Sequence, residues 1–174
     1  MSTHGCDKKP GKVSTAAGFK TSNPQGESSR EEPREYPSRP FVGVGVVVLK
    51  GDSVLLVRRS KPPRQGEWSL PGGSQHLGET VRATAAREVR EETGVEIEEP
   101  QFLEVVDAIT RDADGKTRFH YTLVDFYAHW RSGEPCADDD AAQAEWVPLS
   151  RLESLELWDK TEFVIRKAEE LRRC

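Results

Sequence analysis

The sequence contains few cysteines and no long apolar run. Cys6, Cys136 and Cys174 stand far apart, and they form no Cys-x-x-Cys pair and no cluster with histidine. This usage predicts neither a disulfide framework nor a zinc site, and it favours a reducing, cytoplasmic compartment. The longest apolar stretch, Phe41–Leu49, is far shorter than the roughly 20 residues that cross a bilayer. We therefore expect no membrane segment.

The chain also lacks a surplus of positive charge. Its formal net charge is −5, and the lysines and arginines are spread along all 174 residues. A nucleic-acid surface normally needs a basic patch, so we expect no nucleic-acid partner. A small nucleotide stays compatible, because a few cations or a bound metal can meet its phosphates. The length suits one domain with an appendage; it does not fix the oligomeric state, so a homodimer stays open.

The N-terminal stretch has little that could form a core. Residues 1–39 are rich in serine, glycine, proline, lysine and glutamate, and their sizeable apolar side chains are Val13, Phe19 and Tyr36. Such a segment cannot offset its conformational entropy by burial. We predict a disordered tail over residues 1–39 and a folded domain over residues 40–174. The functional alternative is a partner-binding or targeting tail. Asp7 and the lack of an apolar core segment count against a secretory signal, and Asp7 and the missing amphipathic arginine pattern count against a transit peptide.

From Pro40 onward, strand and helix patterns alternate. Valine-rich Phe41–Lys50 and the following Ser53–Arg59 predict a hairpin, and the prolines of Ser60–Trp68 predict a loop. The other expected elements are a helix over Thr80–Thr93 with Thr80 as N-cap and Gly94 past its end, strands over Val95–Asp107, Lys116–Trp130 and Glu145–Val147, and a last helix from about Asp159, where Asp159 and Glu162 resemble a capping box. This order predicts an α+β fold, an α/β/α sandwich with a mixed β-sheet.

Three glutamates lie close together near the end of the first predicted helix. At 100° per residue, Glu91 and Glu92 lie roughly 60° and 40° to either side of Glu88. Like charges this close repel each other, and the C-terminus of a helix disfavours anions. A hard divalent cation such as Mg²⁺ or Mn²⁺ would remove this cost, because it binds carboxylate oxygens. The alternative is a solvated acidic helix face.

The neighbours of these glutamates on the helix fit such a site. Arg87 lies one turn before Glu91 and can pair with its carboxylate. The small side chains of Ala85, Ala86 and Val89 occupy the adjoining arc, and we expect them to seat the helix against a sheet.

Residues 73–95 resemble the Nudix box, G-x₅-E-x₇-R-E-U-x-E-E-x-G-U, in which U is aliphatic. A motif with this many fixed positions is a specific signal. Its positions are matched by Gly73, Glu79, Arg87, Glu88, Val89, Glu91, Glu92, Gly94 and Val95. Gly66–Gly73, Arg39–Val48 and Trp146–Leu152 are similar to further parts of the same superfamily, so the resemblance covers about residues 40–155. It is strongest to the ADP-ribose-pyrophosphatase-like and nucleotide-pool-cleaning branches.

The resemblance implies a hydrolase that cleaves the pyrophosphate bond of a nucleoside diphosphate linked to another moiety. It implies Mg²⁺ or Mn²⁺ as the cofactor, with Glu88, Glu91, Glu92 and the carbonyl of Gly72 as ligands. Glu88 is also a candidate for the base, although this role moves between members of the superfamily. The implied catalytic set is Glu88, Arg87 and Glu92, in which Arg87 orients the carboxylates. Glu79, Gly73 and Gly94 are implied to support the loop and helix.

Substrate contacts are expected outside the box. Arg58 and Arg59 end the second predicted strand, where a guanidinium can meet a phosphate; a surface salt bridge is the alternative. Trp68, Phe126 and Trp130 can stack on a base, but a place in the core is the alternative for each.

Many members of the superfamily add an acidic residue from a later loop to this site, and we expect one here. Asp140 is our candidate, with Asp138, Asp139 and Glu145 as others, and a solvated turn is the alternative. His76 and His120 have no neighbouring cysteine or histidine, so we assign neither to a metal.

The substrate is not fixed by these patterns. The ADP-ribose subgroup has a proline about sixteen residues past its box, and Ala108–Asp112 contains none. The motif of NADH-cleaving relatives is absent too. A nucleoside triphosphate or a sugar nucleotide is therefore the default, alongside ADP-ribose. A non-catalytic Nudix nucleotide sensor and an interaction module are the alternatives to an enzyme.

Overall fold

The computed structural model describes residues 32–62, 64–136 and 141–173, and a compact unit covers Pro33–Cys174. Its elements, in chain order, are β1 (Phe41–Lys50), β2 (Ser53–Arg59), β3 (Trp68–Ser69), β4 (Gly72–Ser74), α1 (Val81–Thr93), β5 (Glu96–Ile97), β6 (Gln101–Arg111), β7 (Thr117–Ser132), β8 (Ala141–Pro148), the 3₁₀-helix η1 (Leu149–Ser154) and α2 (Asp159–Arg173). In this part of the chain, no helix is long and apolar enough to span a membrane.

The strands form one mixed sheet centred on β1 and β7. These two strands run parallel, with Phe41–Leu49 alongside Tyr121–His129, and the other pairs are antiparallel. Strand β1 pairs with β2 at the hairpin, where Leu49 meets Val54, and with β4 at its other end, over Gly43–Gly45. Strand β1 therefore changes its neighbour along its length. Where β1 changes its neighbour, a pocket opens beside Gly43 and Gly45.

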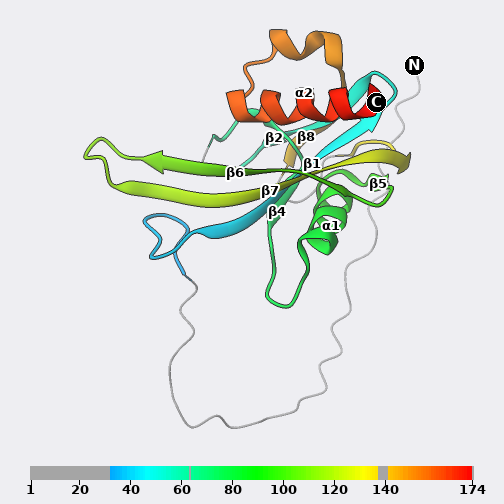
Figure 1. Cartoon of the computed structure of the whole chain (residues 1–174). Helices are drawn as coiled ribbons and strands as arrows, with labels where there is room; N and C mark the ends of the chain where they lie inside the picture. Colours follow the sequence, from blue (N-terminus) through cyan, green and yellow to red (C-terminus); the bar gives the residue numbers. More distant parts are fainter. Residues whose placement is uncertain (1–31, 63, 137–140, 174) are drawn as a thin grey trace, which may run out of the picture. The chain divides into compact units, whose positions relative to one another are not determined.

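Two helices cover opposite faces of the sheet, as the sequence pattern predicts (Figure 1). Because side chains alternate along a strand, Val46 and Val48 face one side and Val47 and Leu49 face the other. The first side packs with Ala85 and Val89 of α1, and the second with Val164, Ile165 and Ala168 of α2. The sandwich prediction is confirmed, and its middle layer is apolar on both faces.

Helix α1 begins and ends where its sequence indicates. The Thr80 side chain accepts a hydrogen bond from the Ala83 N–H at 3.2 Å, and Gly94 has a φ of 71°, which a glycine adopts without strain. The burial of Ala85 is confirmed, but Ala86 is exposed and Thr84 is buried instead. The Thr84 hydroxyl can be buried because it donates to the Glu79 carboxylate at 2.8 Å.

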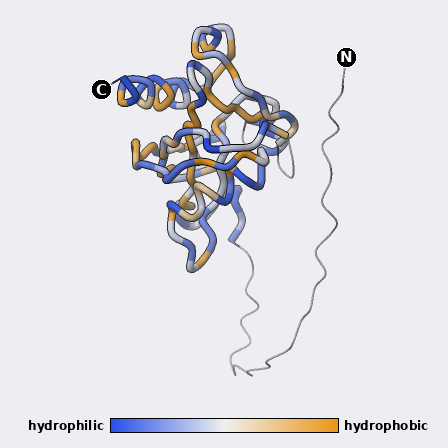
Figure 2. Tube along the Cα trace, turned by 90° about the vertical axis from the view of Figure 1, so that its right-hand side faces the viewer, coloured by the Kyte–Doolittle hydropathy of each residue, from blue (hydrophilic) through white to orange (hydrophobic). Residues whose placement is uncertain are grey.

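Helix α2 has one apolar stripe, visible as recurring hydrophobic stretches along its turns (Figure 2). Asp159 is the first helical residue and not the cap, because the Glu162 N–H donates to the Trp158 carbonyl at 3.0 Å. The predicted capping box is therefore wrong. The sequence pattern was misleading because acidic residues also favour the first turn itself.

The predicted strand over Val95–Asp107 is two strands, β5 and β6. Pro100 lies between them and has no N–H to donate to a ladder. Strand β8 is longer than the predicted Glu145–Val147, because its pairing with β2 continues from Val147 to Ala141. Trp68 belongs to β3 and not to the loop before it.

Two residues assigned to the tail by sequence contact the domain. The Tyr36 hydroxyl donates to the Asp112 carboxylate at 3.0 Å, and Glu35 forms an ion pair with Arg118 at 2.7 Å. The compact unit thus begins at Pro33, seven residues before the sequence-based boundary at Pro40. Residues 1–31 of the predicted tail lie outside the described residues.

The cysteines depart from the sequence-based expectation at one position. Cys136 is disulfide-bonded, whereas the sequence indicated reduced thiols. Cys6 and Cys174 lie outside the described residues.

Removing a core side chain under α1 tests this packing. Leu55 is fully buried against α1, so we expect Leu55→Ala to lower the free energy of unfolding by about 2–5 kcal/mol, because it leaves a cavity. The matched control is Leu77→Ala, whose side chain is fully exposed and which we expect to change stability by at most about 0.5 kcal/mol. Urea denaturation measures both, and equal losses would contradict the assignment.

Candidate active site

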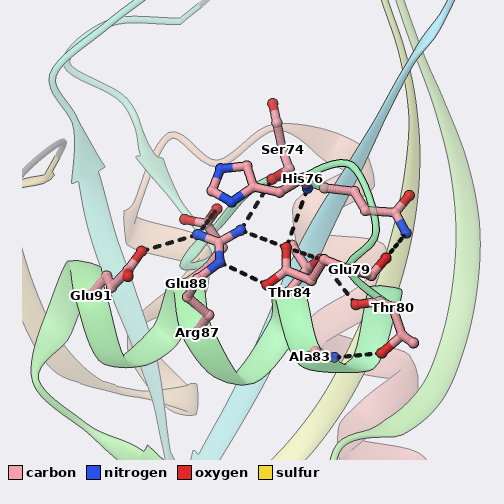
Figure 3. A network of polar contacts seen from close by, with 10 residues as sticks. Ser74, His76, Glu79, Thr80, Ala83, Thr84, Arg87, Glu88 and Glu91 are labelled. Carbon is pink, nitrogen blue, oxygen red and sulfur yellow. Dashed lines mark hydrogen bonds and ion pairs between the residues drawn. The ribbon is translucent and has the colours of Figure 1, made fainter. Parts of the chain in front are cut away.

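Arg87 is the centre of a polar network that joins the loop before α1 to the helix. Its guanidinium donates to Glu79 through Nε at 2.8 Å and Nη2 at 3.0 Å, which is a two-pronged contact. Its Nη1 donates to Glu88 at 2.8 Å and to Glu91 at 3.0 Å, and Nη2 also reaches the Ser74 carbonyl at 3.2 Å. Figure 3 shows the guanidinium among these carboxylates. One cation thus holds three acids and the preceding loop together.

Glu79 is the most strongly held of these acids. Besides Arg87, its carboxylate accepts hydrogen bonds from the Thr84 hydroxyl at 2.8 Å and the His76 N–H at 3.2 Å. The hydrogen bonds from Arg87 contribute most to lowering the pKa of Glu79, to about 2, and desolvation opposes them. Glu79 therefore ties the loop before α1 to the helix.

Glu88 lies against the backbone of Gly73. A Cβ added at Gly73 would meet the Glu88 carboxylate at 2.4 Å, so a side chain there would push this carboxylate out of its place. The Glu88 side chain is 13% exposed, and its burial raises its pKa although Arg87 acts in the opposite direction. The glycine of the box is thus explained by the acid that packs on it.

Glu92 contacts Gly72, the glycine before Gly73. The Gly72 N–H donates to the Glu92 carboxylate at 2.9 Å, and a Cβ at Gly72 would lie 2.0 Å from the Val44 carbonyl oxygen. Glu88 and Glu92 therefore lie at the same Gly-Gly pair, one at each glycine. Glu91 is 43% exposed and pairs with Arg87.

The site offers the ligand chemistry of a hard divalent cation. The carboxylates of Glu88 and Glu92 and the carbonyl of Gly72 supply oxygen atoms, which Mg²⁺ and Mn²⁺ prefer. Among the described residues, no three acidic, histidine or cysteine side chains are already arranged as a metal cage. Glu91 points to Arg87 here, so it would have to leave this ion pair to join the other two. The residues fit a metal, and the ligand set stays a prediction.

A pocket of about 480 Å³ opens next to the glutamates. Its lining includes Glu92, Gly72, Trp68 and Arg59, so the structure brings these four predicted site residues together. Arg58 lies apart in a separate hollow, where its Nε donates to the Gly66 carbonyl at 2.8 Å. This placement gives Arg58 a structural partner and no support as a phosphate contact.

The other predicted contacts lie away from this pocket. Phe126 is 2% exposed and packs in the core, edge to face with Phe102, so the alternative of a core aromatic is confirmed for it. Trp130 stacks under the Lys50 ammonium, 4.1 Å from the ring centre. Glu145 is exposed on β8. Asp140, with its neighbours Asp138 and Asp139, lies outside the described residues.

Sequence reasoning missed four residues that line the pocket. Arg64 lies over the Trp158 ring at 3.9 Å, and Lys160 follows on α2. Asp125 on β7 is 4% exposed, and desolvation raises its pKa to about 6. The available signal for Asp125 was a charged residue within the apolar run of a strand. The residues around Trp158 gave no signal, because only the fold brings α2 over β1.

Comparisons with known proteins agree with this arrangement. A family model described as NUDIX domain matches residues 39–168. The ADP-ribose pyrophosphatase of Methanocaldococcus jannaschii is 35% identical over 116 residues, which are 67% of this chain and 66% of that protein. The solved MutT NUDIX hydrolase from Burkholderia pseudomallei is 31% identical with a TM-score of 0.66, over 75% of this chain and 98% of that one. The NUDIX domain of Shewanella oneidensis NrtR, solved with ADP ribose, is 26% identical with a TM-score of 0.64, over 78% and 90%.

The Glu79–Arg87 contact predicts a pH-dependent stability. Because the pKa of folded Glu79 is lowered to about 2 from an ordinary value of 4.5, its contribution is present above about pH 4.5 and is lost as the pH falls toward 2. We expect Glu79→Gln to lower the melting temperature at pH 7, and this loss to shrink steadily below pH 4.5. Thermal unfolding between pH 2.5 and 7 measures it.

The matched control for this series is Glu99→Gln, an exposed glutamate in the turn before β6. We expect it to change the melting temperature little at any pH. A Glu79→Gln loss that is as large at pH 2.5 as at pH 7 would show that the ion pair is not its source.

Proposed function

This chain belongs to the Nudix family of pyrophosphohydrolases, and from that premise we propose that it hydrolyses the pyrophosphate bond of a nucleoside diphosphate linked to another moiety, using a divalent metal. The observation that carries the proposal is the position of Glu88 and Glu92. Both carboxylates lie at the pair Gly72-Gly73, and Glu92 and this pair line a pocket that a small ligand can enter.

Charged side chains of both signs line the pocket. Glu92 lines it beside the Gly72-Gly73 pair, and Arg59, Arg64 and Lys160 line it as well. A polyphosphate needs cations around it, so it would lie between a metal held by the glutamates and these side chains. Trp68 also lines the pocket, where its ring can contact a sugar or a base.

We assign the roles of the residues from the family resemblance together with their contacts. Glu88, Glu91, Glu92 and the Gly72 carbonyl would hold the metal, which supplies charge neutralisation at the phosphates and lowers the pKa of the attacking water. Glu88 is the candidate that accepts the proton from this water. Arg87 acts on Glu88 and Glu91 through ion pairs and is therefore a positioning residue, not a catalytic one.

The substrate class includes nucleoside triphosphates, ADP-ribose and sugar nucleotides. The relative from Methanocaldococcus jannaschii carries the name ADP-ribose pyrophosphatase, and the Shewanella domain was solved with ADP ribose. These names support ADP-ribose as a member of the test panel although the proline of the ADP-ribose subgroup is missing here. The panel also contains canonical and oxidised dNTPs, NADH and sugar nucleotides, each with Mg²⁺ and with Mn²⁺.

Replacing Glu92 by glutamine tests the catalytic assignment. A metal ligand of this kind contributes several kcal/mol of transition-state stabilisation, so we expect kcat/KM to fall at least about a hundredfold on every substrate that the wild type cleaves. Phosphate release with Mg²⁺, with and without EDTA, measures it. Glu170→Gln, on the exposed side of α2, is the matched control and keeps full activity.

Two outcomes would contradict the proposal. Unchanged metal-dependent turnover by Glu92→Gln would remove Glu92 from the reaction. Tight nucleotide binding with no turnover across the panel would favour the non-catalytic sensor instead, and neither binding nor turnover would favour an interaction module.

A further inference from the structure

A buried carboxylate lies in the wall of the pocket and has no role in the reaction as described so far. Asp125 is 4% exposed and comes from the middle of β7. Within the described part of the chain, no lysine or arginine forms an ion pair with it, and the group that hydrogen-bonds to its carboxylate is the backbone N–H of Gly45. A buried charge without a cation is costly unless something else meets it.

The fold places this carboxylate beside the glutamate site. Gly45 on β1 lies between Gly72 on β4 and Asp125 on β7, and it is paired in register with both. Neighbouring strands are about 4.8 Å apart, so the Gly72 and Asp125 backbones are roughly 10 Å from each other. A Cβ added at Gly45 would lie 2.5 Å from Asp125 Oδ1, so the side chain lies over Gly45 of β1. It is on the face of the sheet that α2 covers, because its neighbours Val124 and Phe126 pack on the α1 side, and it lines the same pocket as Glu92.

Gly45 of β1 provides the space that the Asp125 carboxylate occupies. Any side chain at position 45 would occupy the position of Oδ1. Around it, Leu70, Leu123 and Val106 give the pocket apolar walls. A buried acceptor beside apolar side chains is the arrangement by which small-molecule sites fix the orientation of a ligand.

The charge of Asp125 limits what it can contact. A carboxylate repels phosphate, so the phosphates of a substrate belong at the metal and the basic side chains, away from Asp125. Of the groups in a nucleotide, those that suit Asp125 are neutral and donate hydrogen bonds. They are the sugar hydroxyls and the N–H groups of the base, which are joined to the phosphates within the same small molecule.

We propose that Asp125 is a substrate-recognition residue, which accepts hydrogen bonds from the O–H or N–H donors of the nucleoside part of the substrate. The assignment rests on the function proposed above and adds the group that positions the nucleoside. Gly45 is required for it, because its missing side chain is the space that the carboxylate fills.

A structural role of Asp125 and a role in ligand binding predict opposite effects of its replacement on the stability of the protein. If Asp125 served the fold alone, its replacement would destabilise the protein. If it serves a ligand, asparagine of the same shape removes a buried charge, and we expect Asp125→Asn to keep or raise the melting temperature.

The experiment compares wild type, Asp125→Asn and Gly45→Ala on nucleotides that differ by one donor. GTP against dGTP removes the 2′-hydroxyl, and GTP against ITP removes the amino group of the base. A hydrogen bond to a charged group is worth about ten- to a hundredfold in affinity, so we expect wild type to prefer the donor-bearing partner of one pair by that factor in KM. In Asp125→Asn and Gly45→Ala this preference disappears and kcat changes less than KM.

The matched control is Glu104→Gln. Glu104 lies opposite Asp125 in the β6–β7 register, loses the same charge on substitution and does not line the pocket. We expect its melting temperature to fall, because it loses an ion pair with Lys167 at 2.7 Å, while its substrate preference stays that of the wild type.

A binding measurement distinguishes a failure of this inference from a failure of the proposed function. Calorimetric binding of GMP, dGMP and IMP needs no turnover, so a donor preference that depends on Asp125 would support the inference even if the chain hydrolyses nothing on the panel. Loss of the preference in the sugar pair identifies the hydroxyl, and loss in the base pair identifies the amino group. Equal preference in wild type and Asp125→Asn in both assays, or no binding of any of the three by wild type, overturns it.

Discussion

The contacts of one guanidinium hold the catalytic segment in place. Arg87 binds Glu79 with two nitrogens and reaches Glu88, Glu91 and the loop carbonyl of Ser74 with the same planar group. Without this cation, Glu88 and Glu91 would repel each other near the C-terminal end of α1, which disfavours anions. The same cation ties Glu79 and Ser74 of the preceding loop to the helix.

Two glycines extend the network into the sheet. Glu88 packs on Gly73, and Glu92 accepts the N–H of Gly72. Gly72 in turn lies beside Gly45 of β1, which leaves space for the Asp125 carboxylate. At Gly73 and Gly45 the missing side chain makes room for an acid, and at Gly72 it makes room for the backbone of β1, so these glycines are explained by close approach and not by flexibility. The arrangement links the acids of α1 with the floor of the pocket.

Much of the fold could be predicted because its signals are local. The valine alternation of β1 and the caps of α1 depend on neighbours in sequence, and both are confirmed. Predictions failed where the structure depends on pairing or packing with residues that are distant in the sequence. Strand β8 lengthens because β2 is available as a partner, and Ala86 is exposed because the sheet meets α1 along a different arc than helical geometry alone indicated. Phe126 could be placed on a strand, but which face of the sheet it occupies depends on register.

By itself, the sequence determined the family and the acidic helix face, because both depend on spacing along one segment. It also determined that Arg87 can reach Glu91, since one helical turn separates them. Tertiary structure decided that Arg87 also holds Glu79, that Arg59 and Trp68 share a pocket with Glu92 while Arg58 does not, and that Asp125 belongs to that pocket. These relations join residues from different strands and helices, and their distances are set by strand pairing and layer packing, which leave no local signature in the chain.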